Sequence, residues 1–330
     1  MRRRTFLTLG TEGIKASEAM AADICLYNKT TEKLLIVKSA DFSVESYPSE
    51  NYSPVGVVVV PGTHNVYGDG SCAVIALKWL AGRDWDSEHN LKYGNVGPQN
   101  MYFGGNGVDF STLNNFNKVC YIGLYDSVSS TVEGLREYGY LPSDNYNGLN
   151  NTYDTDTYYY SYSWELLPSP YLTNENRNPA YYQTSSPSST ENALSDFDGY
   201  GNTQKILALA TGQPDWKTAN DITYHDVGGY YGPVCCSWRY SPDGTSEGDW
   251  YLPAAGELGY VIAKLKKINQ TLTLLKNTYG SSKVVILDGM LASSTESDST
   301  NIRQVSINDG YFEYAAKNGY CYPRAFMRVR

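Results

Sequence analysis

The sequence predicts an α+β fold with short antiparallel strands, one long and one or two short helices, and much irregular structure. Short β-branched and aromatic runs are bounded by Gly, Asn, Asp and Pro, a pattern typical of strands. Residues 252–280 carry the three/four spacing of apolar residues that indicates a long helix with one buried face. The 330 residues, 41% of them hydrophobic, suffice for one large or two ordinary domains with a sizeable core.

The first part of the chain is expected to form four strands. Residues 33–42 and 55–62 are β-branched runs flanked by turn residues. Residues 71–80 form the third strand, joined to the second through a turn rich in Gly, Asn and Asp. The fourth strand is 118–126, and the polar, Gly/Asn-rich segment 81–117 before it is interpreted as a loop.

Residues 142–202 are expected to form a long irregular insert. The segment has little periodicity and several Pro, and such a segment in a compact domain is either functional or disordered. Its Tyr and Trp content favours a packed region, because disordered segments are poor in aromatic residues. Asp-Thr-Asp-Thr at 154–157 could supply oxygen ligands to calcium, but it lacks the Gly and the distal Glu of a calcium loop. We therefore expect no metal or cofactor, with calcium as the alternative.

Helices are expected later in the chain, at 202–212, 214–221 and 252–280. Pro253 suits the first position of the long helix, and Gly280 suits the position after its end. The apolar face of this helix consists of Leu258, Ile262, Leu265 and Ile268.

The C-terminal part is predicted to be an antiparallel meander with strands at 283–289, 301–307, 311–316 and 320–329. Asp-Gly and Asn-Gly separate the last three strands, and both are strong hairpin signals because the turn positions require positive φ. In the last strand, period two predicts that Ala325, Met327 and Val329 point inward while Arg324, Phe326 and Arg328 alternate with them.

The charge and hydropathy of the sequence argue against a nucleic-acid partner and against a membrane span. The net charge is −9, and no basic stripe follows the arginines at 2–4, so a nucleic-acid partner is not expected. No run of 18 apolar residues exists, so no membrane span is expected. The arginine-rich start resembles a twin-arginine signal only superficially, because Glu12, Lys15 and Glu18 interrupt its apolar part. Residues 1–51 are interpreted as an N-terminal arm or docking segment of a non-secreted chain.

The six cysteines show no metal-binding spacing and are expected to be buried thiols. Cys235 and Cys236 are adjacent and would make an awkward disulfide with each other. The chain has only three histidines, which leaves few ordinary acid/base candidates.

Three motifs follow one another in the C-terminal half: GDWYLPAAGEL at 248–258, SSTE at 293–296 and RAFMRV at 324–329. Their order resembles the C-type lectin fold in its formylglycine-generating-enzyme-like branch, whose members carry W-x-L-P-x-x-x-E-L, W-S-S-T-E and a terminal V-R-x-V/F-R. The chain departs at Ala292, where the branch usually has Trp. The resemblance implies one ligand-binding domain over 52–330.

The resemblance implies a set of scaffold residues. Glu257, near a helix start, would be stabilised there by the helix dipole. Arg324 and Arg328 are expected to pair with Glu257 or Glu296. The full predicted scaffold is Trp250, Leu252, Pro253, Glu257, Ser293, Ser294, Thr295, Glu296, Arg324 and Arg328.

Within that branch the chain is similar to the variable proteins of diversity-generating retroelements found in gut Bacteroides and their phages. These systems mutate template adenines, often in AAC codons, which cannot yield Trp, Lys, Glu, Gln or Met. Residues 297–322 are drawn largely from the remaining alphabet, with Gln304, Glu313 and Lys317 as exceptions. The predicted variable region spans 288–322. The alternative is that an ordinary polar strand-and-turn region has this composition.

The resemblance thus predicts a binding module whose variable face contacts a protein or glycan on a bacterial surface. Tyrosines would supply rigid aromatic area, and Asp and Asn adaptable hydrogen bonds. The predicted ligand-binding residues are Ser297, Asp298, Thr300, Asn301, Gln304, Ser306, Asn308, Asp309, Tyr311, Glu313, Tyr314, Asn318, Tyr320 and Tyr322.

A phage tail-fibre receptor-binding protein in the virion is the expected role. Its N-terminus would contact other tail proteins, and it would form a homotrimer. A bacterial surface or secreted adhesin or glycan-binding lectin is the alternative.

Two further alternatives stay open. An oxidoreductase like the formylglycine-generating enzymes would use a pair of late cysteines, of which the chain has Cys235, Cys236 and Cys321. No acid/base cluster supports them, so we expect no enzyme. A calcium-dependent sugar binder would carry E-P-N or Q-P-D and W-N-D, but only Asn308-Asp309 of these is present.

Overall fold

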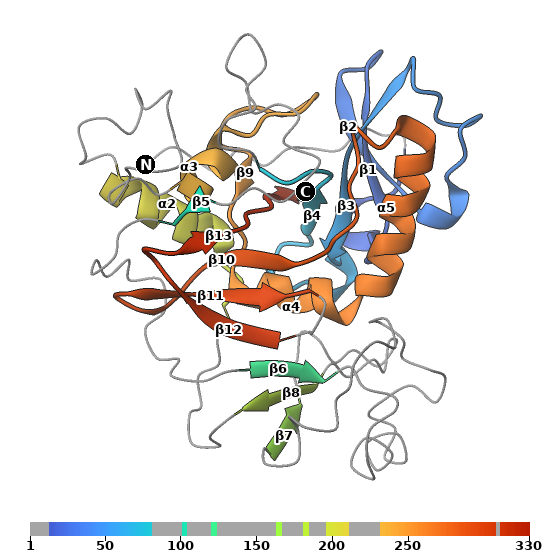
Figure 1. Cartoon of the computed structure of the whole chain (residues 1–330). Helices are drawn as coiled ribbons and strands as arrows, with labels where there is room; N and C mark the ends of the chain where they lie inside the picture. Colours follow the sequence, from blue (N-terminus) through green and yellow to red (C-terminus); the bar gives the residue numbers. More distant parts are fainter. Residues whose placement is uncertain are drawn as a thin grey trace.

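The computed structural model confirms the α+β class, with antiparallel sheets and few helices among the described residues (Figure 1). The predicted helix 214–221 and most of the predicted insert 142–202 lie outside those residues. The structure describes residues 13–80, 101–103, 120–123, 163–166, 181–184, 196–210, 232–307 and 311–330.

The first sheet has six strands in the order β2-β1-β3-β4-β14-β9, and every neighbouring pair is antiparallel. The C-terminal strand therefore lies inside the sheet, between strands from distant parts of the chain. Its members are β1 (Ile24–Asn28), β2 (Lys33–Val37), β3 (Tyr52–Val60), β4 (Cys72–Ala76), β9 (Trp250–Tyr251) and β14 (Phe326–Val329).

The second sheet has the order β10-β11-β12-β6-β8-β7, and a two-stranded sheet pairs β13 with β5. The predicted hairpin is present as β11 and β12, which pair from Asn301 opposite Ala316 to Ser306 opposite Tyr311. The strands are β5 (Met101–Tyr102), β6 (Cys120–Gly123), β7 (Ser163–Leu166), β8 (Tyr181–Thr184), β10 (Met290–Asp298), β11 (Asn301–Ser306), β12 (Tyr311–Ala316) and β13 (Tyr320–Cys321).

The predicted long helix is present as two helices, α4 (Ala255–Ala263) and α5 (Leu265–Tyr279). The break lies at Lys264, whose φ of −126° and ψ of 16° are not helical. Leu258, Ile262, Leu265 and Ile268 are all buried, which confirms the predicted apolar face. The other helices are α2 (Gly199–Ala210), α3 (Gly232–Arg239) and the 3₁₀ turns η1 (Ala16–Glu18), η2 (Ser39–Asp41) and η3 (Gly62–His64).

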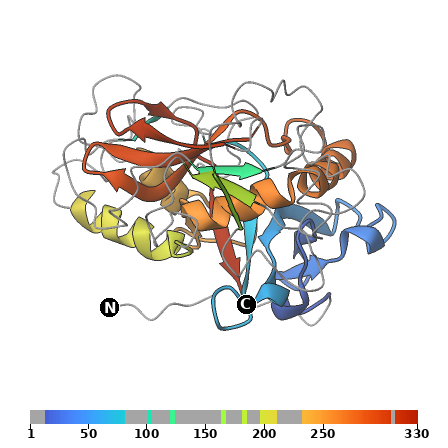
Figure 2. The same cartoon turned by 90° about the horizontal axis from the view of Figure 1, so that it is seen from below.

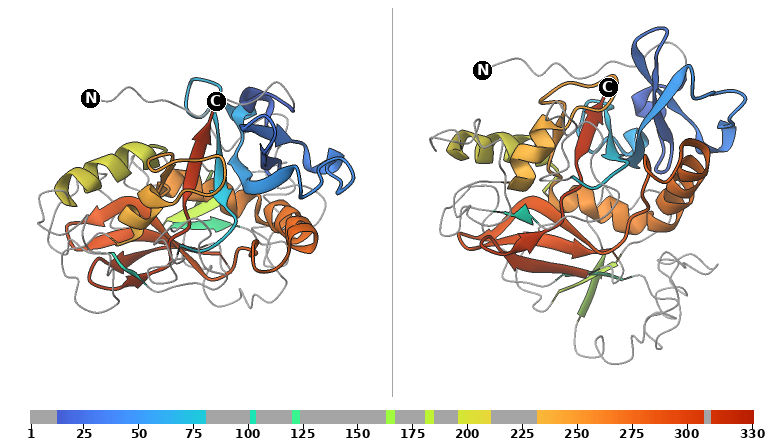
Figure 3. Two further views of the ribbon diagram at one scale, coloured as in Figure 1. Left: turned by 90° about the horizontal axis from the view of Figure 1, so that it is seen from above. Right: turned by 45° about the horizontal axis from the view of Figure 1, so that its top comes forward.

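The helices cover the sheets from different sides. Helices α4 and α5 pack against β3, and α4 also contacts β10 and β11 (Figure 2). Helix α2 contacts β10 and β9, and α3 contacts β9 and β5 (Figure 3). None of the described helices is long and apolar enough to cross a membrane.

Strand β14 is buried on both faces, which corrects the predicted alternation. Ala325, Met327 and Val329 lie in one apolar cluster with β1 and β4 residues, as expected of inward positions. Phe326, however, is fully buried in the main core beside Tyr251. Period two predicts a solvent face only for a strand with one covered face, and a central strand has two.

Three other strand predictions need correction. The strand predicted at 320–329 is two strands of different sheets, β13 and β14. Residues 283–289 form no strand; instead the Val285 N–H donates to the Leu77 carbonyl at 2.9 Å. The strand predicted at 33–42 ends at Val37 and is followed by η2. Strands β1 and β2, from the segment interpreted as an N-terminal arm, pair within the same sheet as β3, whose first residue is Tyr52.

Candidate ligand-binding face

The SSTE motif forms a bulge in β10 that ties the second sheet to the start of α4. Regular pairing stops between Ala292 and Glu296, so the three residues between them leave the ladder. The Ser294 N–H donates to the Pro253 carbonyl at 2.7 Å, and the Ser293 hydroxyl donates to the Arg303 carbonyl at 2.8 Å. Two of the three motifs that carry the family resemblance, GDWYLPAAGEL and SSTE, are therefore in direct contact.

Thr295 connects this bulge to two helices. Its hydroxyl accepts the Ala255 N–H of α4 at 2.9 Å and donates to the Asp196 carboxylate at 2.7 Å. The same carboxylate oxygen accepts the Asn202 side-chain amide of α2 at 2.7 Å. Burial raises the pKa of Asp196, although these hydrogen bonds oppose the shift. The sequence contained no motif that pointed to Asp196.

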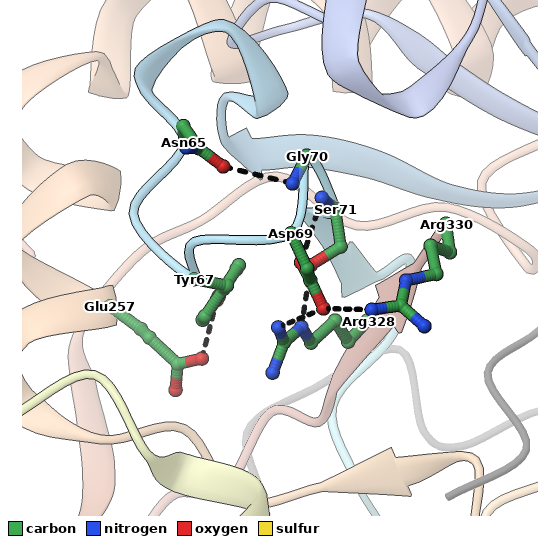
Figure 4. Close-up of polar contacts among 8 residues, drawn as sticks. All are labelled: Asn65, Tyr67, Asp69, Gly70, Ser71, Glu257, Arg328 and Arg330. Carbon is green, nitrogen blue, oxygen red and sulfur yellow. Dashed lines mark hydrogen bonds and ion pairs between the residues drawn. The ribbon is translucent and has the colours of Figure 1, made fainter.

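Glu257 lies in the first turn of α4 and is fully buried (Figure 4). One carboxylate oxygen accepts the Ala254 N–H at 2.8 Å, which caps the helix. The other accepts the hydroxyls of Tyr67 at 2.6 Å and Tyr251 at 2.7 Å. Burial raises the pKa of Glu257 to about 7, against the opposing effect of the hydrogen bonds.

The predicted pairing of Arg324 and Arg328 with Glu257 or Glu296 is wrong. Arg328 instead forms an ion pair with Asp69 at 2.7 Å, and its guanidinium lies 4.1 Å from the centre of the Tyr67 ring (Figure 4). Arg330 contacts the same carboxylate at 2.8 Å. Burial raises the pKa of Asp69, but hydrogen bonds from Ser71 and Arg328 outweigh it and hold the pKa well below its usual range.

Arg324 binds backbone carbonyls rather than a carboxylate. Its Nε donates to the Ala76 carbonyl and one Nη to the Val285 carbonyl, both at 2.7 Å, and the other Nη donates to the Ile286 carbonyl at 3.3 Å. The side chain is buried and lies over the Trp79 ring, and burial lowers its pKa to about 9. Arg324 thus fastens the segment after α5 to the first sheet.

Glu296 forms a fully buried ion pair with Lys317, a residue outside the predicted scaffold. Lys317 is the first residue of the turn after β12, and its backbone N–H donates to the Thr300 carbonyl at 2.7 Å. The β12–β13 turn therefore meets the β10–β11 turn at one end of the sheet.

Among the residues of the predicted variable segment whose exposure the structure describes, all the exposed ones except Asp288, which precedes β10, lie at these two turns. Thr300 and Asn318 are exposed, and Asn301 is half-buried. Ser299 and Ala316 are also exposed and were absent from the predicted site. Because Asn301 pairs with Ala316, these five positions belong to one continuous end of the sheet.

Other predicted binding residues divide between the two faces of the β11–β12 hairpin. Gln304 is opposite Glu313, and Ser306 is opposite Tyr311, so these four positions share one face. Tyr314 is opposite Arg303, on the other face. The predicted residues therefore do not form a single face.

The remaining predicted residues are more scattered. Ser297 and Asp298 end β10, and Tyr320 begins β13. Tyr322 is half-buried against the main core, and its carbonyl accepts the Ala292 N–H at 3.1 Å. Asn308 and Asp309 lie outside the described residues.

Five of the six cysteines are confirmed as buried free thiols, and the sixth, Cys120, lies in β6. Cys235 and Cys321 share an apolar cluster with Ala292, the position at which the branch has Trp. Burial raises the pKa of Cys235 to about 12 and also raises the pKa of Cys321. Both thiols are therefore protonated at neutral pH.

Among the described residues, no group of three or more His, Cys, Asp or Glu side chains could hold a metal ion. The Asp-Thr-Asp-Thr segment at 154–157 lies outside those residues. Comparison of the chain with protein-family models, with curated proteins and with solved structures finds no match.

Proposed function

We propose that this protein is a ligand-binding module of the C-type lectin fold, in the formylglycine-generating-enzyme-like branch, that binds through one end of its second sheet. The observation that carries the proposal is the gathering of Ser299, Thr300, Asn301, Ala316 and Asn318 at two adjoining turns. These side chains are small. The backbone that carries them is held by two buried polar contacts, the Ser293–Arg303 hydrogen bond and the Lys317–Glu296 ion pair. Rigid scaffolds of this kind position variable contact residues.

The contact between the two motifs supports the proposed fold. The GDWYLPAAGEL segment supplies the Pro253 carbonyl and the Ala255 N–H, and the SSTE segment supplies their partners, Ser294 and Thr295. The motif residues are thus interdependent: all four are buried, and Ser294 and Thr295 each bond to a backbone group of the other segment. This interdependence accounts for their joint presence in the sequence.

Diversification by a retroelement is the proposed source of variation at the turns. Thr300, Ala316 and Asn318 belong to the alphabet that adenine mutation can produce, and all three are exposed. Lys317 is outside that alphabet, and its side chain is fully buried. Five residues of 297–322 depart from this correspondence, because they are within the alphabet yet buried: Ile302, Arg303, Val305, Ile307 and Cys321.

The proposed role is that of a phage tail-fibre receptor-binding protein that recognises a protein or glycan on the bacterial surface. The N-terminal part would contact other virion tail proteins, and a homotrimer is the proposed assembly. A bacterial surface or secreted adhesin is the alternative. The oxidoreductase is not favoured, because Cys235 and Cys321 are protonated thiols in an apolar cluster, whereas reactive cysteines are thiolates.

Sequencing of this gene from independent isolates tests the diversification. The expected result is substitutions concentrated at 297–322, with the exposed turn positions among them, all traceable to template adenines. Lys317 and Glu296 are expected to remain unchanged. Substitutions scattered over the chain, or synonymous changes, would contradict the proposal.

Substitution of the exposed turn residues tests the binding. A Thr300→Ala/Asn318→Ala variant is expected to lose adsorption to gut Bacteroides cells that bind the unaltered protein. A matched control is Lys266→Ala/Gln270→Ala, at two exposed positions of α5. Equal adsorption by both variants would exclude this end of the sheet as the binding site.

A further inference from the structure

The buried ion pair between Lys317 and Glu296 lies directly beneath the proposed binding turns. Lys317 begins the turn after β12, and Glu296 lies two residues before the end of β10. Both side chains have no exposed surface. The Lys317 N–H also donates to the Thr300 carbonyl, so the same residue joins the two turns through its backbone and through its side chain.

Stability alone does not account for such a pair. Removing two charges from water costs about as much as their attraction returns, and apolar residues of similar volume are often as good or better. A buried pair does, however, have one geometry in which both charges are satisfied. It therefore selects one relative position of the two segments that carry it.

The residues next to Lys317 indicate why the position of these two turns has to be fixed. Ala316 and Asn318, on either side of Lys317, are both exposed. Ser299 and Thr300 in the β10–β11 turn are exposed as well. Side chains at these positions make little contact with the core and so cannot hold the turns in place when they change. The interaction that fixes the two turns must therefore involve a buried side chain, and the buried side chain between these exposed positions is that of Lys317.

We propose that Lys317 and Glu296 are positioning residues: their buried ion pair fixes the backbone of the two turns, so that the exposed positions can vary without moving the binding surface. The inference rests on the proposed function, since it concerns the same turns. Its first part, that the pair holds the turns, is independent of any ligand.

Amide hydrogen exchange of the free protein tests that first part. In a Lys317→Met/Glu296→Met variant, the exchange of the Lys317 amide and its neighbours at 316–319 is expected to accelerate at least tenfold, while the urea unfolding midpoint stays unchanged or rises. Unchanged exchange at these amides would overturn the proposal. If the double variant does not fold, Lys317→Met/Glu296→Gln, which also leaves no buried charge unpaired, replaces it with the same two outcomes.

Two controls separate a positioning role from a general loss of stability. The charge-reversed Lys317→Glu/Glu296→Lys variant restores an ion pair and is expected to restore slow exchange. Asp69→Asn breaks the distant ion pair with Arg328 and is expected to leave exchange at 316–319 unchanged. Acceleration in Asp69→Asn equal to that in the double variant would show that the turns follow global stability, which would overturn the proposal.

Adsorption to gut Bacteroides cells tests the second part. The Lys317→Met/Glu296→Met variant is expected to bind at least tenfold more weakly, although it alters none of the exposed residues. Normal binding by this variant, together with weakened binding by Thr300→Ala/Asn318→Ala, would overturn the positioning role alone. Normal binding by Thr300→Ala/Asn318→Ala would instead refute the proposed site, while the exchange result would still decide whether the pair holds the turns.

Discussion

At the scale of single residues, the buried charged groups of this protein differ in how they are satisfied. Glu257 is held by three neutral donors, Arg324 by three carbonyls, and Glu296 by a lysine. Each arrangement has a different dependence on pH and on substitution. Two of them give direct predictions.

Glu257 should make the protein less stable as the pH rises. Burial raises its pKa from 4.5 to about 7, so between these values the folded chain binds more protons at Glu257 than the unfolded chain. Its contribution to the free energy of unfolding therefore falls by about 3 kcal/mol across this window. Urea unfolding of the unaltered protein and of Glu257→Gln between pH 4.5 and 8 measures the contribution. Parallel pH profiles of the two proteins would contradict it.

Arg324 should not tolerate replacement by lysine. A single ammonium cannot present the planar fork that reaches the carbonyls of Ala76, Val285 and Ile286 together, so buried acceptors would lose their donors. Arg324→Lys is expected to lower the free energy of unfolding by about 2–4 kcal/mol. The control is Arg330→Lys at a half-exposed position, where a change below about 0.5 kcal/mol is expected. Similar losses in both variants in urea unfolding would refute the argument.

At the scale of elements, local signals specify hairpins well and bulges poorly. The β11–β12 hairpin was predictable from Asp-Gly between two strand-like runs. The SSTE bulge was not, because its geometry depends on Pro253 and Ala255 on another element. The β1–β2 hairpin shows a further local feature that sequence patterns do not reveal.

Glu32 in the β1–β2 hairpin has a φ of 57°, in the left-handed region that side chains other than Gly rarely adopt. It is exposed, so its side chain contributes little packing. Glu32→Gly is therefore expected to raise the free energy of unfolding by about 0.5–1 kcal/mol. Lys33→Gly, in the neighbouring strand β2, is the control and is expected to lower it by a similar amount. Thermal or urea unfolding distinguishes the two; a loss in Glu32→Gly would be the contrary result.

At the scale of the whole molecule, the N-terminal strands belong to the same sheet as the rest of the fold. Leu26 of β1 lies opposite Leu35 of β2 on one side and Pro54 of β3 on the other, and both leucines are buried in the main core. The C-terminal strand β14 completes this sheet between β4 and β9. The two ends of the described chain therefore stabilise one structure.

A chain that begins at residue 52 is consequently expected not to fold cooperatively. It would lack β1 and β2 and leave the edge of β3 that pairs with β1 without its partner strand. The matched control is Leu26→Ala in the full chain, expected to lose about 2–5 kcal/mol while keeping a cooperative transition. Circular dichroism during urea unfolding makes the comparison. A sharp transition with an unchanged midpoint in the shortened chain would show that residues 1–51 form a separate arm.

The sequence by itself determined the α+β class, the buried face of α4 and α5, the β11–β12 hairpin and the burial of five of the six cysteines. Each of these depends on residues close together in the chain, through periodicity, turn chemistry or side-chain polarity. The proposed binding turns were predictable only as a segment, because composition does not state which of its residues face solvent.

Only the tertiary structure decided which buried polar side chains contact one another. Tyr67 and Glu257 are 190 residues apart in the chain, and nothing in either local pattern marks them as a pair. In the sequence, Lys317 is likewise only a residue outside the alphabet of the variable segment. Its buried ion pair with Glu296 is visible in the tertiary structure alone. Such contacts depend on which faces meet in the folded protein, and a buried charge takes whichever partner that packing brings to it.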